Sequence, residues 1–113
     1  MPDSLATLAR VTELLRRHPL VDGHNDLPWE AREQCGYDFD RLDIGDDVAT
    51  TCTDVPRLRA GGVGAQFWSV FVPSSLQGDS AVVATLEQVD AVHQMVGRYA
   101  GELGFARTAD EVE

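Results

Sequence analysis

The sequence contains no lysine, only two cysteines and no long apolar run, and each shortage excludes a class of protein. All basic residues are arginine; nine stand against 19 acidic residues, for a formal net charge of -10. A surface this acidic repels phosphate backbones, so we expect no nucleic-acid partner. No stretch approaches the roughly 20 apolar residues of a membrane span, so we also expect no membrane partner.

The cysteines, Cys35 and Cys52, show no CxxC or other zinc-finger spacing. Both lie in loop-like surroundings, and we expect free thiols in a reducing compartment rather than a disulfide-stapled scaffold. The N-terminus also lacks the apolar core and small-residue cleavage site of a secretory signal. These shortages together predict a cytoplasmic protein.

Length sets a further bound on the fold. The chain has 113 residues, enough for one small domain with a core. An eight-fold β/α barrel needs about 250 residues, so a complete barrel is excluded. The apolar share is 43%, which is ordinary for a folded globular protein. We therefore expect an ordered domain and not a disordered chain.

The first third of the chain predicts a helix, a strand and a second helix. Asp3 or Ser4 caps an amphipathic helix that Pro19 stops, and we expect this helix to lie over an apolar surface. A short strand is predicted at 20–24. Pro28 is well placed to start a short helix directly after it.

The middle of the chain predicts a loop and then a helical turn. Residues 36–47 are acidic and weakly periodic, which indicates a surface loop. Thr53 or Asp54 caps a helical turn, and the glycines at 61–62 end it. The same glycines do not form a phosphate-binding loop, because they precede a strand and no Lys-Ser/Thr follows.

A strand and a long helix follow in the order typical of an α/β protein. The strand is predicted at 63–72, with large apolar groups on both faces, and Phe67, Trp68 and Phe71 are expected in the core. Asp79 or Ser80 caps the helix. Its apolar stripe is Val82, Val83, Leu86, Val89, Val92, Val96 and Leu103.

The last residues predict the beginning of a further helix. Thr108 to Glu111 form a capping box, and the sequence stops two residues later. A helix needs a longer body than this to be stable. We therefore expect a truncated chain.

Three polar residues where the first strand becomes a loop are the candidates for chemistry. Asp22, His24 and Asp26 are spaced two apart, so their side chains converge if the backbone stays extended. An imidazole and a carboxylate together suit zinc or a similar divalent ion. The alternative is that such a triplet only caps a helix or closes a turn, and that Asp22 orients a neighbour or bonds to backbone.

Longer runs of sequence carry a family resemblance. Residues 21–29 resemble the opening metal motif of the renal (membrane) dipeptidase family, and 56–70 resemble its second strand and the approach to it. Residues 85–90 are similar to a later helix of the same family. The resemblance spans His18 to Tyr99, with its motifs in the family's order.

The resemblance implies an α/β fold, the N-terminal part of a (β/α)8 TIM-barrel-like metallohydrolase that is incomplete in this chain. Residues 1–113 are then an N-terminal fragment of a single barrel domain. The implied activity is hydrolysis of a small dipeptide substrate by two zinc ions. His24 and Asp26 are the implied ligands of one metal, with Asp22 as a possible orienting residue that does not touch it.

The departures from the family leave the assignment of activity open. The family's bridging Glu and further His ligands have no counterpart here, and no catalytic residue is identified in this chain. Cys52 stands where relatives commonly carry His, at a position that is not a metal ligand. We expect the chain alone to bind zinc weakly and to be inactive. Its expected partners are the missing remainder of the barrel or further copies of itself.

Two other functions remain as alternatives: one half of a split enzyme, and a non-catalytic binding or assembly module. The remaining polar candidates predict less. His93 is expected at the border of the long helix's apolar stripe. Arg57 and Arg59 are expected on a solvated helix face, with binding of a substrate carboxylate as the alternative.

Overall fold

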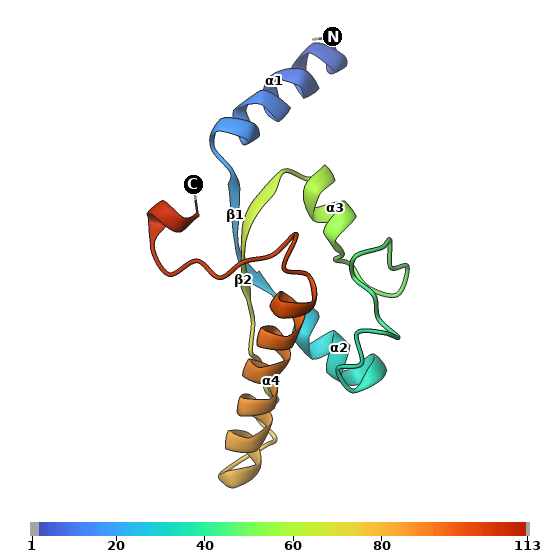
Figure 1. Ribbon diagram of the computed structural model, residues 1–113, viewed down its shortest axis with the longest axis vertical. Helices are drawn as coiled ribbons and strands as arrows, with labels where there is room; N and C mark the ends of the chain where they lie inside the picture. Colours follow the sequence, from blue (N-terminus) through green and yellow to red (C-terminus); the bar gives the residue numbers. More distant parts are fainter. Residues whose placement is uncertain (1–2, 113) are drawn as a thin grey trace.

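Two parallel strands form the centre of the computed structural model, which describes residues 3–112 (Figure 1). β1 (Leu20–Asn25) and β2 (Val63–Trp68) pair with Asp22 opposite Gln66 and Asn25 opposite Trp68. The other elements are α1 (Ser4–Arg17), α2 (Leu27–Cys35), α3 (Val55–Ala60), α4 (Asp79–Arg98) and the 3-10 helix η1 (Ala109–Glu111). The predicted α/β class and the order of elements are confirmed. None of the described helices is both long and apolar enough to cross a bilayer.

β2 is shorter than the predicted strand at 63–72. Its last bond to the neighbouring strand is from the Ser69 N–H to the Asn25 carbonyl, at 2.8 Å. Beyond that point β1 has already turned into α2, so the following residues have no strand to pair with. The carbonyl of Phe71 instead accepts a hydrogen bond from the buried side chain of Gln88 on α4, at 2.9 Å. Helix α4 therefore holds the segment that the periodicity assigned to the strand.

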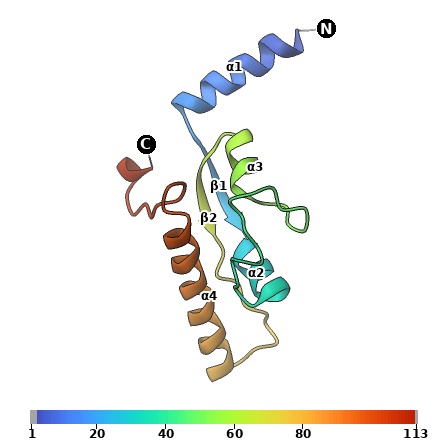
Figure 2. The same ribbon diagram turned by 45° about the vertical axis from the view of Figure 1, so that its right-hand side comes forward.

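α1 has the predicted ends but not the predicted environment. The Asp3 carboxylate accepts a hydrogen bond from the Leu5 N–H, and Arg16 and Arg17 lie in the last turn. The helix buries none of its residues, so the expectation that it lies over an apolar surface is wrong for the described chain. It projects beyond the amino ends of the strands (Figures 1 and 2), and His18 and Pro19 connect it to the start of β1.

The hydrophobic core includes the segment that was predicted to be a surface loop. Phe39, Leu42 and Ile44 are buried, although 36–47 contains no helix or strand. They pack with residues of α2, α3 and the end of α4, namely Leu27, Ala31, Val55, Met95 and Tyr99. Their irregular spacing follows neither a helical nor a strand period, which is why the periodicity missed them.

α4 differs from its prediction in its cap and in its buried face. It begins after Gly78, whose φ is 57°, and neither Asp79 nor Ser80 provides a side-chain cap. Of the predicted stripe, Val92 and Val96 are buried, while the members in the first half are exposed. Those exposed members are Val82, Val83, Leu86 and Val89. The first half of α4 extends past the carboxyl end of the sheet, so that face has no described neighbour (Figure 1).

The remaining local predictions divide between confirmed and wrong. Thr108 and Glu111 form the predicted capping box. A Cβ on Gly64 would lie 2.1 Å from the Pro19 Cβ, so the glycine-rich turn serves close backbone packing as expected. Trp68 packs against the core, but Phe67 and Phe71 are exposed, and for these two the core prediction is wrong.

Candidate metal centre

The carboxyl end of β1 brings His24 and Asp26 together. His24 lies in the strand, and Asp26 occupies the N-cap position of α2 without a side-chain capping bond. The imidazole Nε2 is 3.0 Å from the carboxylate Oδ2. The two side chains therefore converge as the spacing predicted, and Asp26 does not close the helix by capping.

This pair is open to solvent, and the pKa of its carboxylate is lowered. The side chains of His24 and Asp26 are 67% and 51% exposed. The hydrogen bond with His24, opposed by some desolvation and helped by the Ser69 hydroxyl, holds the pKa of Asp26 below its usual range. An ionised carboxylate is the form that binds a metal, so Asp26 is ready to bind one at neutral pH.

Asp22 is not part of the same cluster. Its carboxylate Oδ1 is 3.5 Å from the backbone N–H of His24, at the limit of a hydrogen bond. Its backbone carbonyl accepts a bond from the Gln66 side chain at 3.2 Å. Asp22 thus contacts the backbone of His24 and not its ring, and a role in orienting the ring stays a prediction.

Asn25 holds the turn between the two candidate ligands, and the sequence reasoning passed over it. Its Oδ1 accepts the Leu27 N–H at 3.0 Å, and its Nδ2 donates to Thr53 Oγ1 at 2.9 Å. Asn25 therefore ties the first turn of α2 to the segment before α3. An Asn directly before a helix start commonly bonds to the backbone two residues on, and that signal was available in the sequence.

The segment before α3 is itself held by an ion pair between the buried Asp54 and the exposed Arg57. Asp54 is fully buried, and its carboxylate accepts bonds from the backbone N–H of Val48 at 2.9 Å and of Arg57 at 2.8 Å. The Arg57 guanidinium bonds the same carboxylate and also the carbonyl of Thr51, each at 2.7 Å. Arg57 thus stabilises this segment while 42% of its side chain stays exposed on the helix face, as expected. Arg59 forms an ion pair with Glu102.

Beside Asp26 the surface is hollowed. A pocket of about 310 Å³ is lined by Asn25, Asp26, Leu27, Glu30, Thr50, Thr51, Cys52 and Thr53. Both thiols are free: Cys52 is exposed and lies outside helices and strands, whereas Cys35 is half-buried at the end of α2, so for Cys35 the expected loop-like surroundings are wrong. The position that departs from the family's usual His therefore lines the pocket at the candidate site.

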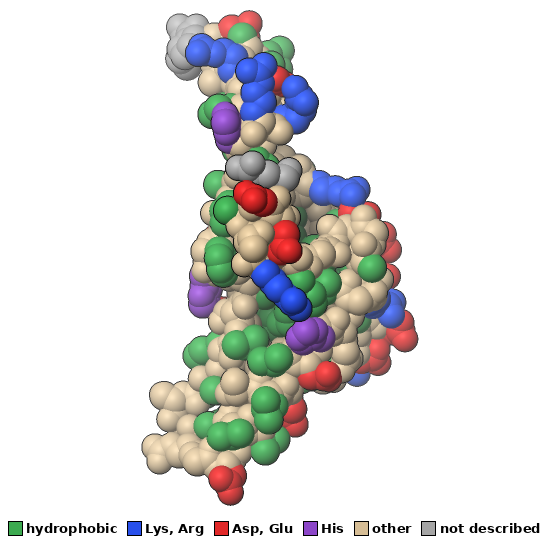
Figure 3. Space-filling model, turned by 60° about the vertical axis from the view of Figure 1, so that its left-hand side comes forward, with side chains coloured by type: hydrophobic (Ala, Val, Ile, Leu, Met, Phe, Trp, Pro, Cys, Tyr) green, Lys and Arg blue, Asp and Glu red, His purple; other side chains and the backbone are tan. Residues whose placement is uncertain are grey.

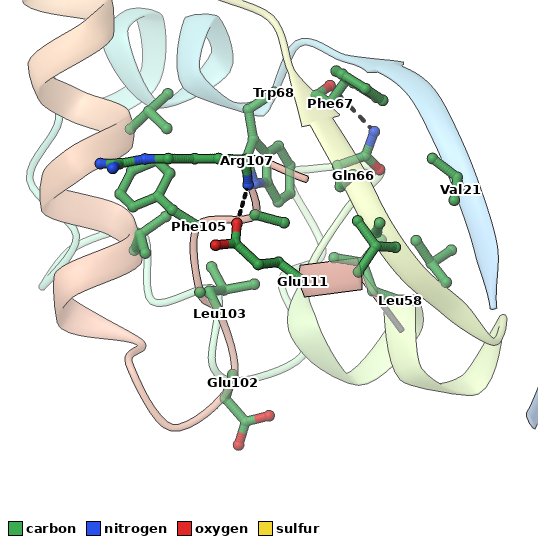
Figure 4. A pocket seen from close by; sticks show the side chains of 18 of the residues that line it. Val21, Leu58, Gln66, Phe67, Trp68, Glu102, Leu103, Phe105, Arg107 and Glu111 are labelled. Atoms are coloured by element: carbon green, nitrogen blue, oxygen red, sulfur yellow. Dashed lines mark hydrogen bonds between the residues drawn. The ribbon is translucent and has the colours of Figure 1, made fainter. Parts of the chain in front are cut away.

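A larger pocket of about 780 Å³ lies away from these residues (Figure 4). It is bounded by β2, the second half of α4 and the segment 102–112, and none of Asp22, His24 and Asp26 lines it. Glu111 bonds the backbone N–H of Arg107 and so folds that segment over the opening. His93 stacks on Phe105 at 4.7 Å between ring centroids, the helix-border position that was predicted. The larger cavity is therefore not the place where metal chemistry is expected.

The donor atoms of His24 and Asp26 are of the types that bind zinc, and the distance between them is close to the distance expected at a zinc ion. Zinc in proteins binds imidazole nitrogen and carboxylate oxygen, and two such atoms at a tetrahedral ion lie roughly 3.4 Å apart. The observed 3.0 Å requires only a small opening. Within residues 3–112, however, no three His, Cys, Asp or Glu side chains are grouped so as to hold a metal. The fit is that of a partial ligand set, and the metal role of the pair stays a prediction.

The described residues thus form a parallel β/α unit with an imidazole and a carboxylate at the carboxyl end of its first strand, which is the class of an α/β protein. The chain belongs to the membrane dipeptidase family (peptidase family M19), whose model matches residues 8–113. This confirms the resemblance that the motifs carried.

The curated relatives are dipeptidases that are several times longer. The chain is 37% identical over 113 residues to dipeptidase ataJ of Aspergillus terreus. That alignment covers 93% of this chain and 27% of the relative. It is 38% identical to dipeptidase verJ of Clonostachys rogersoniana, and the alignment covers 93% of this chain and 29% of the relative. It is also 38% identical to human dipeptidase 3, with 96% of this chain and 22% of the relative covered. The chain thus spans about a quarter of the length of these relatives.

Proposed function

We propose that this chain provides the first metal-binding segment of a zinc-dependent dipeptidase, with His24 Nε2 and Asp26 Oδ2 as ligands of one of two zinc ions. The observation that carries the proposal is the 3.0 Å approach of these two exposed side chains at the end of β1. Membership of the membrane dipeptidase family supports hydrolysis of a dipeptide as the proposed reaction. The substrate proposed is a small dipeptide.

Residues of this chain hold the two proposed ligands in position without a bound ion. Asn25 fixes the backbone between the two ligands by bonding Leu27 and Thr53. The contact with His24 holds the pKa of Asp26 below its usual range. Zinc, when bound, polarises the peptide carbonyl and supplies hydroxide at neutral pH.

The described residues do not complete the site. Catalytic zinc is held by about three protein ligands and a water, and this chain offers two. We therefore propose that the missing ligands come from further parallel strands of a TIM-like barrel, of which β1 and β2 are the first two. Two features support this: the strands are parallel, and in the described region β2 pairs only with β1, which leaves its other edge for a third strand.

A chimera tests the proposal directly. Residues 8–113 would replace the matching segment of dipeptidase ataJ, and dipeptide hydrolysis would be measured with and without a chelator. We expect chelator-sensitive activity that His24→Ala and Asp26→Ala each lower at least 100-fold, because each removes a direct ligand. His93→Ala is the matched control, since that imidazole stacks on Phe105 away from the pair.

Two results would contradict the proposal. Activity that survives both ligand substitutions would assign the segment a non-catalytic role, and an inactive, correctly folded chimera would exclude it as a source of the first ligands. A calorimetric titration of the 113-residue chain adds a second check. Weak zinc binding that His24→Ala abolishes is expected, whereas tight one-to-one binding would show a complete site that the described residues lack.

A further inference from the structure

β1 contains one residue more than β2 where the two strands approach the candidate metal ligands. Asp22 of β1 pairs with Gln66 of β2. The next pair is Asn25 with Trp68, so two residues of β1 but only one of β2 lie between the pairs. The proposed ligand His24 is the second of those two residues. An extra residue of this kind is a β-bulge, which disrupts the ladder locally and re-aims the side chains beside it.

The side-chain amide of Gln66 bonds β1 on both sides of this bulge. Its Nε2 donates to the Asp22 carbonyl, which precedes the extra residue, at 3.2 Å. Its Oε1 accepts from the Asn25 Nδ2, which follows the extra residue, at 3.5 Å, the limit of a hydrogen bond. The same Nε2 donates to the carbonyl of Phe67 at 3.3 Å (Figure 4). The amide is therefore anchored on its own strand and spans the irregular part of the neighbouring one.

The bulge accounts for the separation of Asp22 from the two proposed ligands. In a regular strand, residues 22, 24 and 26 would share one face. An extra residue interrupts that alternation. The Asp22 carboxylate accordingly contacts the backbone N–H of His24, at 3.5 Å, while the His24 ring lies 3.0 Å from the Asp26 carboxylate. The direction of the His24 ring therefore follows from the bulge and not from regular strand geometry.

The two described strands form the bulge between them. β1 and β2 pair with each other, and the third strand that we propose lies at the other edge of β2, away from β1. Helix α1, on which Arg side chains gather (Figure 3), lies at the amino ends of the strands, whereas the bulge lies toward their carboxyl ends. Neither the proposed third strand nor α1 therefore takes part in the bulge.

We propose that Gln66 is a positioning residue for the metal site, because its amide fixes the bulge in β1 and thereby the direction in which His24 presents Nε2. This inference rests on the metal role of His24 in the proposed function. Gln66 does not touch the ion and acts through the backbone of β1. Removing a hydrogen bond that orients a metal ligand typically lowers metal affinity about 10- to 100-fold. We expect an effect of that size from the loss of the Gln66 amide.

NMR of the metal-free 113-residue chain tests the effect on the bulge. Gln66→Leu removes the amide, and we expect the single set of backbone signals from residues 23–25 to become several sets or to broaden. Gln88→Leu is the matched control, because the same change removes a bonded amide on α4 and should leave those signals unchanged. If Gln66→Leu does not fold, Gln66→Met replaces it, since it removes the same bonds and keeps an unbranched side chain. Unchanged signals from residues 23–25 in a folded Gln66 variant overturn the proposal.

Zinc affinity of the dipeptidase chimera tests the link to the metal site. In a metal-buffered titration we expect Gln66→Leu to weaken zinc binding about 10- to 100-fold and Gln88→Leu to leave it unchanged. His24→Ala separates this inference from the proposed function on which it rests. Zinc affinity that falls with His24→Ala but not with Gln66→Leu overturns the role of Gln66 alone. Zinc affinity that His24→Ala does not lower overturns the proposed function and the role of Gln66 with it.

Discussion

The carboxylate of Asp54 lies fully buried and accepts hydrogen bonds from both the backbone N–H and the guanidinium of Arg57, at 2.8 and 2.7 Å. Asp54 thus caps α3, and the Arg57 guanidinium neutralises the charge that the cap buries. Because the same guanidinium bonds Thr51, this pair also shapes the segment that meets Asn25.

Acid should destabilise the chain through Asp54. Its pKa is lowered to about 2, chiefly by the bond with Arg57, so its stabilising contribution is full above the unfolded value near 4 and is lost as the pH falls toward 2. The contribution is about 2 kcal/mol. Urea unfolding at pH 6, 4 and 3 measures it.

Asp54→Asn provides the comparison, because it keeps the shape and removes the charge. We expect the variant to be less stable at pH 6 and to lose less stability than the wild type on acidification. Parallel losses in the two proteins would assign the acid sensitivity to other carboxylates.

Asn25→Ala should loosen the turn that carries the candidate ligands. It leaves the Leu27 N–H and the Thr53 hydroxyl without their partner, at a cost of about 1–2 kcal/mol. Thermal unfolding measures the loss. Gln94→Ala is the control, because its bond to Asp90 is exposed on α4 and should change stability by less than about 0.5 kcal/mol. Equal effects of the two changes would contradict the role given to Asn25.

Gln88→Leu should be more damaging than Tyr37→Phe. The buried Gln88 amide accepts the Tyr37 hydroxyl at 2.6 Å and donates to the Phe71 carbonyl at 2.9 Å, so its removal strands two polar groups. We expect a loss of about 2–3 kcal/mol, against about 1 kcal/mol for Tyr37→Phe. Trp29 packs edge-on against Phe71, with ring centroids 5.3 Å apart, so its fluorescence should change with Gln88→Leu. An unchanged emission spectrum would show that Gln88 does not hold Phe71 in place.

Gly64→Ala and Gly97→Ala should change stability in opposite directions. A Cβ at position 64 meets Pro19 at 2.1 Å, so the strand must shift, and we expect a loss of at least about 2 kcal/mol. A Cβ at position 97 meets nothing within 4 Å inside helix α4, so we expect a gain of roughly 0.5–1 kcal/mol. Urea midpoints of the two variants check both signs, and a neutral Gly64→Ala would contradict the close packing of β2 on Pro19.

Local chemistry in the sequence predicted the order of the elements and several of their ends. Asp54 caps α3, Pro19 ends α1, and the spacing of His24 and Asp26 brings their side chains together, because each of these depends on neighbours within a few residues. The dipeptidase motifs identified the family for the same reason, since they are contiguous runs of sequence.

What lies between elements could not be predicted from such patterns. Phe39, Leu42 and Ile44 are buried against Met95 and Tyr99, which lie more than 50 residues later in the sequence. The spacing of apolar residues within the loop does not predict this burial. The spacing predicted the apolar stripe of α4, but the spacing alone does not predict which surface covers that stripe. Its first half lies exposed because the sheet that would face it ends early.

Tyr99, at the end of α4, bonds to Asp43 and Ile44, which lie more than 50 residues earlier in the sequence. Its hydroxyl donates to the Asp43 carboxylate at 2.8 Å and accepts the Ile44 N–H at 3.0 Å, so the residue that ends α4 fixes the loop that supplies three residues to the core. During synthesis that loop emerges first and remains open until α4 is made. A nascent chain that stops short of Tyr99 therefore exposes Phe39, Leu42 and Ile44 together.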